Sequence, residues 1–248
     1  MALDLLPSSM LRAIDLLPDP QTPVTLFTRH SVREMLAGQG LAGYDLQLTE
    51  QGRDLAHAWG AYLIQNTDRV IQHCISSPIQ RCVDTAALMI QGADTIVDAS
   101  NTHRIEIVEQ SLLVEPGSFV LDIQQAAPYF KQQGALGFIN SFVNNALPGM
   151  KHPITGAADV LEVIYNAHPQ TARGLSLAVS HDTIIAAILA IISGHSQIAA
   201  EDWPAMMEGL FVWFEGDEFS NSQLKWIWRG QAHQLQICDF LQRDPSLS

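Results

Sequence analysis

The chain has 248 residues, of which 47% are hydrophobic and 16% charged, and its 26 acidic and 13 basic side chains give a formal net charge of −13. This composition is typical of a globular protein rather than a disordered or fibrous one, and the length is enough to bury a substantial core, most simply in a single domain over residues 1–248. The acidic balance argues against nucleic acids and anionic membranes as partners, because both are bound through basic surfaces.

The N-terminal segment lacks the basic start, the apolar run and the small-residue cleavage site of a secretory signal. No stretch is long and apolar enough to span a bilayer, so we expect a cytoplasmic protein. Residues 1–22 are expected to form an N-terminal extension whose leucines pack on the domain. The three cysteines, Cys74, Cys82 and Cys238, show no paired spacing, so neither a disulfide framework nor a zinc site is predicted.

A short β-prone run at residues 24–27 begins the domain. Polar residues follow it at once, as they do at the C-terminal end of a buried strand. The next residues include Arg29, His30 and Arg33, two arginines and a histidine within five positions of an acidic chain. The pattern therefore places concentrated positive charge on a loop at the end of a strand.

An amphipathic helix is predicted after this loop. Leu55, Trp59, Tyr62 and Leu63 fall at i, i+4, i+7 and i+8, which is the spacing of one helix face. Thr49 precedes them as the predicted N-cap.

A second strand is predicted at residues 73–76, with another helix directly after it. Ser77, Pro78 and Gln80 are suited to be the N-cap, the first helical residue and the partner in a capping box. Arg81 then falls in the first turn, where unpaired backbone N–H groups and the helix dipole already favour an anion. This strand end, too, carries positive charge.

A third strand and its exit are expected at residues 104–114, and residues 117–172 are expected to form a helical insertion that shapes the substrate site. A fourth apolar strand at 175–179 ends at Ser-His-Asp, residues 180–182. The run TIIAAILAII follows and is apolar on all sides, which predicts a core helix.

Three late segments, 211–214, 223–228 and 233–238, predict an antiparallel hairpin and one more strand. Strands that alternate with helices earlier in the chain indicate parallel pairing. We therefore predict an α/β fold, a three-layer αβα sandwich with a mostly parallel central sheet. Ligands in such sheets bind beyond the carboxyl ends of the strands, which is where the polar clusters fall.

These clusters have the chemistry that phosphoryl transfer requires. The reaction needs cations around the phosphoryl oxygens, an in-line nucleophile and a proton donor for the leaving oxygen. Arg29, Arg33 and Arg81 can form the anion cradle, while His30 and His181 supply a nucleophile and a further donor. The arginines of the first cluster thus indicate a phosphate pocket.

The same segments resemble motifs of the histidine phosphatase superfamily, which has the phosphoglycerate mutase-like fold. TRHSVRE is similar to its Arg-His-Gly motif, SSPIQRCVDTA to its second arginine motif and VSHDT to its distal histidine motif. The resemblance implies that His30 becomes phosphorylated, that Arg29, Arg33 and Arg81 hold the phosphate, and that His181 contacts the transferring group. It implies a phosphorylated small molecule or phosphopeptide as substrate, and neither a metal nor an organic cofactor.

The resemblance leaves two candidates for the general acid. LLVEPGSF at 112–119 is similar to the loop that carries a glutamate in part of the family, which nominates Glu115. The acid-phosphatase branch uses the aspartate after the distal histidine, here Asp182, and a first-turn aspartate can also cap its helix. We favour Glu115, because an acid on a separate loop can approach the leaving group opposite the nucleophile.

Two departures from the family pattern bear on activity. Ser31 replaces the usual glycine, and its side chain can crowd the phosphate or add a hydroxyl contact. The mutase branch starts its motif with Gly-Glu-Ser and has a nearby Trp-Asn pair, which SVREMLAGQG does not supply. A phosphatase is therefore favoured over a phosphoglycerate mutase-type phosphotransferase.

Two further alternatives stay open. A metal hydrolase would take His30, Glu34, His181 and Asp182 as ligands, although neighbouring arginines repel a divalent ion. A catalytically weak phosphate-binding or scaffolding member of the same fold would keep the arginine pocket without forming phosphohistidine.

Overall fold

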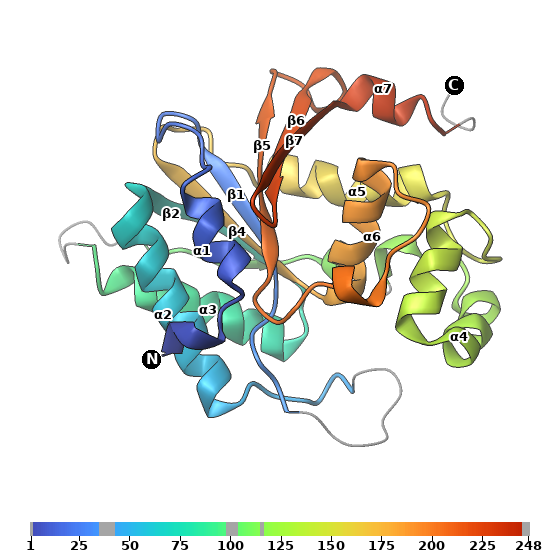
Figure 1. Ribbon diagram of the computed structural model, residues 1–248, viewed down its shortest axis with the longest axis horizontal. Helices are drawn as coiled ribbons and strands as arrows, with labels where there is room; N and C mark the ends of the chain where they lie inside the picture. Colours follow the sequence, from blue (N-terminus) through green and yellow to red (C-terminus); the bar gives the residue numbers. More distant parts are fainter. Residues whose placement is uncertain (1, 35–42, 98–103, 115–116, 245–248) are drawn as a thin grey trace.

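The computed structural model describes residues 2–34, 43–97, 104–114 and 117–244, and a seven-stranded sheet forms its centre (Figure 1). The strand order is β3-β2-β4-β1-β5-β6-β7. Four neighbouring strands run parallel: β3 (Ile107–Glu109), β2 (Val70–Ser76), β4 (Gly174–Ser180) and β1 (Val24–Arg29). The other three each pair antiparallel with their neighbours, beginning with β5 against β1: β5 (Gly209–Glu215), β6 (Gln223–Trp228) and β7 (Gln231–Gln236).

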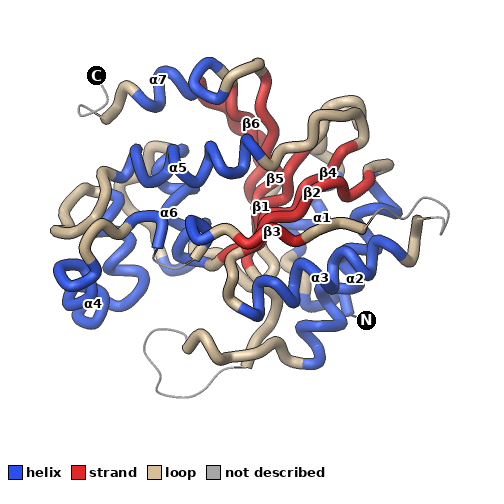
Figure 2. The backbone as a smooth tube through the Cα atoms, turned by 180° about the vertical axis from the view of Figure 1, so that it is seen from behind, coloured by secondary structure: helices blue, strands red, loops and turns tan. Residues whose placement is uncertain are grey.

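Helices cover both faces of the sheet, as two views from opposite sides show (Figure 1, Figure 2). One layer contains α1 (Ser8–Ile14), α2 (Glu50–Thr67) and α3 (Gln80–Asp94). The other contains α4 (Ile123–Val143), α5 (Pro153–Asn166), α6 (Asp182–Ser193) and the short α7 (Ile237–Leu241). The predicted three-layer α/β sandwich is confirmed. Short 3-10 helices lie at Ala2–Leu5, Ser111–Leu113, Gly117–Phe119, Ala200–Asp202 and Phe219–Asn221.

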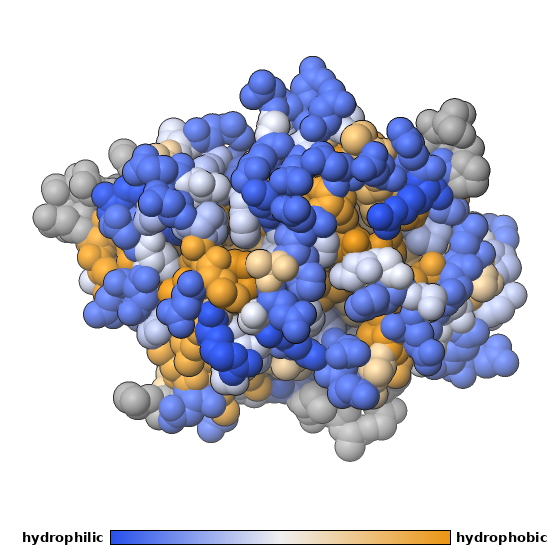
Figure 3. Space-filling view, turned by 45° about the horizontal axis from the view of Figure 1, so that its top comes forward, coloured by the Kyte–Doolittle hydropathy of each residue, from blue (hydrophilic) through white to orange (hydrophobic). Residues whose placement is uncertain are grey.

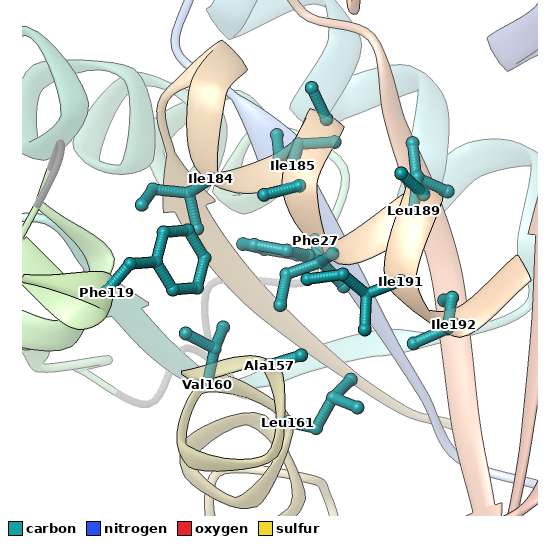
Figure 4. Close-up of a cluster of buried hydrophobic side chains, with 14 of the residues drawn as sticks. Phe27, Phe119, Ala157, Val160, Leu161, Ile184, Ile185, Leu189, Ile191 and Ile192 are labelled. Atoms are coloured by element: carbon teal, nitrogen blue, oxygen red, sulfur yellow. The ribbon is translucent and has the colours of Figure 1, made fainter. Parts of the chain in front are cut away.

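Two hydrophobic cores, one on each face of the sheet, follow from the alternation of side chains along a strand. In β1, Val24 and Leu26 belong to the core under α2 and α3, whereas Phe27 belongs to the core under α5 and α6. Every residue from 183 to 192 is buried, which confirms the predicted core helix. Figure 4 shows Phe27 among side chains of α5 and α6, such as Val160 and Ile185.

The N-cap of α2 is confirmed, whereas that of α3 differs from the prediction. Thr49 accepts a hydrogen bond from the N–H of Gly52 over 3.0 Å. Helix α3 begins at Gln80 with Ile79 at the N-cap, so the predicted capping role of Ser77 was wrong. The hydroxyl of Ser77 accepts from the N–H of Ile79 at 3.3 Å in a local turn. It also contacts a residue of the site described below.

The last predicted strand, 233–238, is shifted. Strand β7 covers Gln231–Gln236, and Ile237 begins α7. Ile237 and Phe240 are both buried, and this spacing of three is that of a helix rather than of a strand. Residues 104–114 hold only the short β3 followed by a 3-10 turn.

The N-terminal residues pack on the α2 side of the sheet. Leu6, Met10 and Ala13 are buried in that core, while Leu5 and Leu16 are largely exposed. The range 117–172 contains α4 and α5, and its predicted influence on the substrate site stays a prediction. The face drawn in Figure 3 is mainly polar, with small groups of apolar side chains between. Of the helices that the structure describes, none has both the length and the apolar character to cross a membrane.

Candidate active site

The polar segments at the ends of β2, β4 and β1 come together because these strands are neighbours and run parallel. In the ladders, Arg29 pairs with Ser180, and Ser76 pairs with Val179. The residue after each strand therefore leaves the sheet at the same edge. His181, at the end of the middle strand, lies between the segments that carry His30 and Ser77.

The side chain of Arg81 lies between the two histidines. Its Nε is 3.1 Å from Nε2 of His30, and its Nη2 is 3.3 Å from Nδ1 of His181. The imidazole centroids are 5.6 Å apart. A third contact, from Nη1 to the carbonyl of Gly43 at 3.2 Å, fixes the plane of the guanidinium. One cation thus binds to both imidazoles within a buried cluster.

These contacts determine the tautomer of each imidazole. A guanidinium only donates hydrogen bonds, so Nε2 of His30 and Nδ1 of His181 must both be acceptors. The proton of His30 then lies on Nδ1, which donates to the carbonyl of Ser31 over 2.8 Å. The proton of His181 lies on Nε2, which donates to the hydroxyl of Ser77 over 2.9 Å. His30 therefore presents the lone pair of Nε2 to the cluster.

Both imidazoles are held neutral by their surroundings. Burial is the largest cause that lowers the pKa of His30 well below its ordinary value, and the charge of Arg29 lowers it further. Burial, followed by the charge of Arg81, lowers the pKa of His181 to about 3. Removal from water and nearby cations both disfavour an imidazolium. A neutral imidazole keeps the electron pair that a nucleophile needs.

Arg29 is anchored from two sides. Its Nη2 forms a salt bridge of 2.6 Å with Oδ2 of Asp182, and its Nη1 donates to the carbonyl of Pro204 over 2.7 Å. The other carboxylate oxygen of Asp182 accepts from the N–H of Thr183 at 2.9 Å. Asp182 thus opens α6 with both oxygens engaged.

Arg33 lies beside this cluster. Its positive charge is among the causes that lower the pKa of His181, although the smallest. Its Nη1 donates to the carbonyl of Glu34 over 2.9 Å, while its buried Nε has no hydrogen-bond partner among the described residues. A buried N–H group of this kind can donate a hydrogen bond to a bound anion.

Glu115 lies outside the described residues. On its N-terminal side, Leu113 is next to the cluster, because its carbonyl accepts a hydrogen bond of 2.8 Å from the hydroxyl of Ser180. Ser180 directly precedes His181 at the end of β4.

Ser31 is hydrogen-bonded within the fold. Its hydroxyl donates to the carbonyl of Gly52 over 2.7 Å, its N–H donates to Oγ1 of Thr85 over 3.0 Å, and the residue is fully buried. The hydroxyl therefore donates its hydrogen bond within the fold, and its effect on phosphate stays a prediction. The side chain instead joins the exit of β1 to the first turn of α2.

Sequence reasoning missed several residues around the histidines. Ser77 binds to His181 rather than capping α3, and Sγ of Cys82 is 3.7 Å from Nε2 of His181. Pro204, which anchors Arg29, is 175 positions further along the chain. A sequence motif identifies the residues within it, but it does not indicate a hydrogen-bond partner as distant in sequence as Pro204.

The metal-site alternative finds no support in the geometry. Within the described ranges, no three His, Cys, Asp or Glu side chains form a group suited to a metal ion. The proposed ligands His30, Glu34, His181 and Asp182 are therefore not gathered around one point.

Comparison with known proteins concerns the family and the fold of the chain. The family model of the histidine phosphatase superfamily (branch 1) matches residues 25–209. The solved structure of mycobacterial hydrolase 1 is similar with a TM-score of 0.53 and 18% identity, over 84% of this chain and 98% of that one. A mycobacterial glucosyl-3-phosphoglycerate phosphatase has a TM-score of 0.51 and 17% identity, over 84% and 99%. A phosphoglycerate mutase from Bacillus anthracis has a TM-score of 0.50 and 15% identity, over 91% and 99%.

At such low identities these likenesses concern the fold, and they confirm the predicted phosphoglycerate mutase-like architecture. A search of curated proteins finds no match.

Proposed function

Because the chain belongs to branch 1 of the histidine phosphatase superfamily, whose members act on phosphorylated substrates, we propose that it hydrolyses phosphomonoesters through a phosphohistidine on His30. The observation that carries the proposal is the position of Arg81, which donates to both imidazoles within a buried cluster. The substrate is a phosphorylated small molecule or a phosphopeptide.

In the first step, Nε2 of His30 attacks phosphorus while the bond to the leaving oxygen breaks. The Nε–H of Arg81 transfers its hydrogen bond from Nε2 to a phosphoryl oxygen, which frees the lone pair for attack. Arg29 and Arg33 balance the remaining charge. The hydrogen bond from Nδ1 of His30 to the carbonyl of Ser31 stabilises the positive charge that develops on the ring.

The leaving oxygen receives its proton from Glu115. Asp182 is the weaker candidate, since its two oxygens already accept from Arg29 and from the N–H of Thr183. In the second step, the Glu115 carboxylate takes a proton from water, the hydroxide attacks phosphorus, and the bond to His30 breaks. Inorganic phosphate leaves, and the neutral imidazole is restored.

Turnover is favoured over mere phosphate binding by the orientation of Ser31. The substitution of the family's glycine was one reason to consider a binding-only protein, and the choice between two general acids was the other. The hydroxyl of Ser31 donates to the carbonyl of Gly52, which weakens the first reason. Phosphatase activity is favoured over mutase activity because the sequence SVREMLAGQG, which follows His30, lacks the mutase pattern.

The proposal is tested with a panel of phosphomonoesters, each assayed with and without a strong chelator, followed by acid-labile phosphoenzyme trapping on the best substrate. We expect hydrolysis that survives chelation and a label that is lost in His30→Ala. His73→Ala, which changes an exposed histidine of β2, should keep both. Hydrolysis that the chelator abolishes, or full activity of His30→Ala, would overturn the proposal.

A further inference from the structure

The segment 203–208, which leads into β5, forms part of the wall behind Arg29 and His30. The carbonyl of Pro204 accepts from Nη1 of Arg29 over 2.7 Å, and the carbonyl of Glu208 accepts from the N–H of Arg29 over 3.0 Å. The N–H of Met207 donates to the carbonyl of His30 over 3.3 Å. The direction of the Arg29 side chain therefore depends on the shape of this segment.

The buried side chain of Glu208 determines that shape. It is 4% exposed, and its Oε2 accepts from the N–H of Ala205 over 3.0 Å, while the N–H of Glu208 donates back to the carbonyl of Ala205 over 3.0 Å. These two bonds close the turn that begins directly after Pro204. The carbonyl that anchors Arg29 thus belongs to a turn held by Glu208.

Two residues from distant segments hold the Glu208 carboxylate in turn. Arg229 binds it with two parallel bonds, from Nε to Oε1 at 2.9 Å and from Nη2 to Oε2 at 3.0 Å. The hydroxyl of Ser9, in α1, donates to Oε1 over 2.9 Å. Burial alone would raise the pKa of Glu208, but the hydrogen bonds from Arg229, Ala205 and Ser9 outweigh it and leave the pKa lowered.

Arg229 also fixes the beginning of the segment. Its Nη1 donates to the carbonyl of Glu201 over 2.9 Å, and its Nη2 donates to that of Trp203 over 3.3 Å. The Glu208 side chain of this ion pair is buried while that of Arg229 is partly exposed, and removing Arg229 leaves a buried carboxylate without its counter-charge. The Glu208–Arg229 pair thus makes the segment sensitive to a change at either residue.

We propose that Glu208 is a positioning residue of the phosphate pocket, which acts on Arg29 through the Pro204 carbonyl and is held in place by Arg229 and Ser9. The inference rests on the proposed phosphate-binding role of Arg29. It gives a function to the segment before residue 25, which precedes the family match, because Ser9 becomes part of the support of the pocket. If Glu208 no longer holds the turn, the hydrogen bond from Arg29 to the Pro204 carbonyl weakens. The salt bridge to Asp182 then determines the direction of the Arg29 side chain.

The test measures the Kd of inorganic phosphate and of orthovanadate for the full chain. Glu208→Gln keeps the shape of the side chain but removes its charge and puts an N–H2 group in place of one oxygen. Whichever way the amide turns, Arg229 loses one acceptor and its ion pair, so the support of the turn is weakened. We expect affinity to fall about tenfold, the ratio given by about 1.4 kcal/mol. Lys225→Met, which removes the exposed salt bridge to Glu215 at 2.7 Å on the neighbouring strands, should leave both Kd values unchanged.

A double-mutant cycle separates positioning from general loss of stability. If Glu208 acts through Arg29, Glu208→Gln should change Kd less than twofold in an Arg29→Lys background, since coupled residues are not additive. An equal loss in both backgrounds, or an unchanged Kd in folded Glu208→Gln, overturns the inference.

A milder variant covers the case in which Glu208→Gln does not fold. Ser9→Ala removes a single hydrogen bond and should weaken phosphate binding about threefold, and an unchanged Kd counts against the inference. If the unmodified protein binds neither phosphate nor vanadate, the proposed function fails together with the inference. Binding by the unmodified protein with no change in the variants defeats the inference alone.

Discussion

The Nε–H of Arg81 donates to Nε2 of His30 over 3.1 Å. The same guanidinium donates to Nδ1 of His181 over 3.3 Å. A lysine ammonium is a point charge without this planar fork and cannot reproduce both contacts.

Arg81→Lys is therefore expected to lower kcat/KM about a hundredfold or more, as does the removal of one oriented donor from a charged transition state. Steady-state kinetics on the best substrate of the panel measure the loss. Arg53→Lys is the matched control, because Arg53 pairs with Asp84 at 3.0 Å on the surface of the neighbouring helix. An Arg81→Lys enzyme as active as this control would contradict the role of the fork.

The general acid can be identified by its dependence on the leaving group. Glu115→Gln should slow the hydrolysis of an alkyl phosphate strongly and that of a nitrophenyl phosphate little, because a good leaving group departs without a proton. Asp182→Asn should slow both to a similar extent, because it disturbs the anchor of Arg29. Selective rescue of Asp182→Asn by the good leaving group would transfer the acid role to Asp182.

Ser31→Gly should cost stability and leave catalysis nearly unchanged. The variant leaves the buried carbonyl of Gly52 without the hydroxyl of Ser31 and adds conformational freedom to the unfolded chain, so the free energy of unfolding should fall by about 1–2 kcal/mol. Urea unfolding measures the loss, and kcat/KM is measured in parallel. A marked rise in kcat/KM would show that Ser31 does restrict the pocket.

The protonation of the two imidazoles can be observed directly. Between pH 8 and 5, the ring ¹⁵N signals of His30 and His181 should stay those of neutral imidazoles, with the proton on Nδ1 of His30 and on Nε2 of His181. The reason is that the pKa of His30 lies well below its ordinary value and that of His181 is about 3. In the urea-unfolded chain the same signals should titrate at about pH 6.5. A folded-state titration of His30 near neutrality would contradict the neutral nucleophile.

The same lowered pKa values link stability to pH. Below about pH 6.5, His30 and His181 bind protons in the unfolded chain but stay neutral in the folded protein. The free energy of unfolding should therefore fall as the pH falls. Each histidine contributes at most about 1.4 kcal/mol per pH unit. Urea unfolding at pH 7 and pH 5 should show a smaller decrease in His181→Asn than in the unmodified protein. Identical decreases would rule out His181 as a source of the effect.

Local patterns were enough to predict much of this fold. The change of period from alternating strands to helix faces located β1, α2 and α6, and polar residues directly after the strands marked the edge where His30 and His181 meet. Parallel pairing of β2, β4 and β1 then brings those ends together without further information.

Long-range pairings could not be predicted in this way. Ser77 is a good cap by its local sequence, yet its hydroxyl binds to His181, 104 positions away. Asp182 and Pro204, which anchor Arg29, are both far from it in sequence. Pro204 lies near Arg29 only because β5 pairs with β1. Such partners depend on the folded arrangement rather than on spacing.

The main chains of β5 and β1 nearly touch where the segment 203–208 ends. A Cβ atom built on Gly209 would lie 2.4 Å from the carbonyl oxygen of Phe27 and 2.6 Å from Cα of Thr28. Neither backbone can yield without moving the strand that leads to His30. A single methyl group at position 209 is therefore expected to push β5 and β1 apart and so to disturb the segment that carries Pro204, although the methyl group itself would contact no residue that binds the substrate.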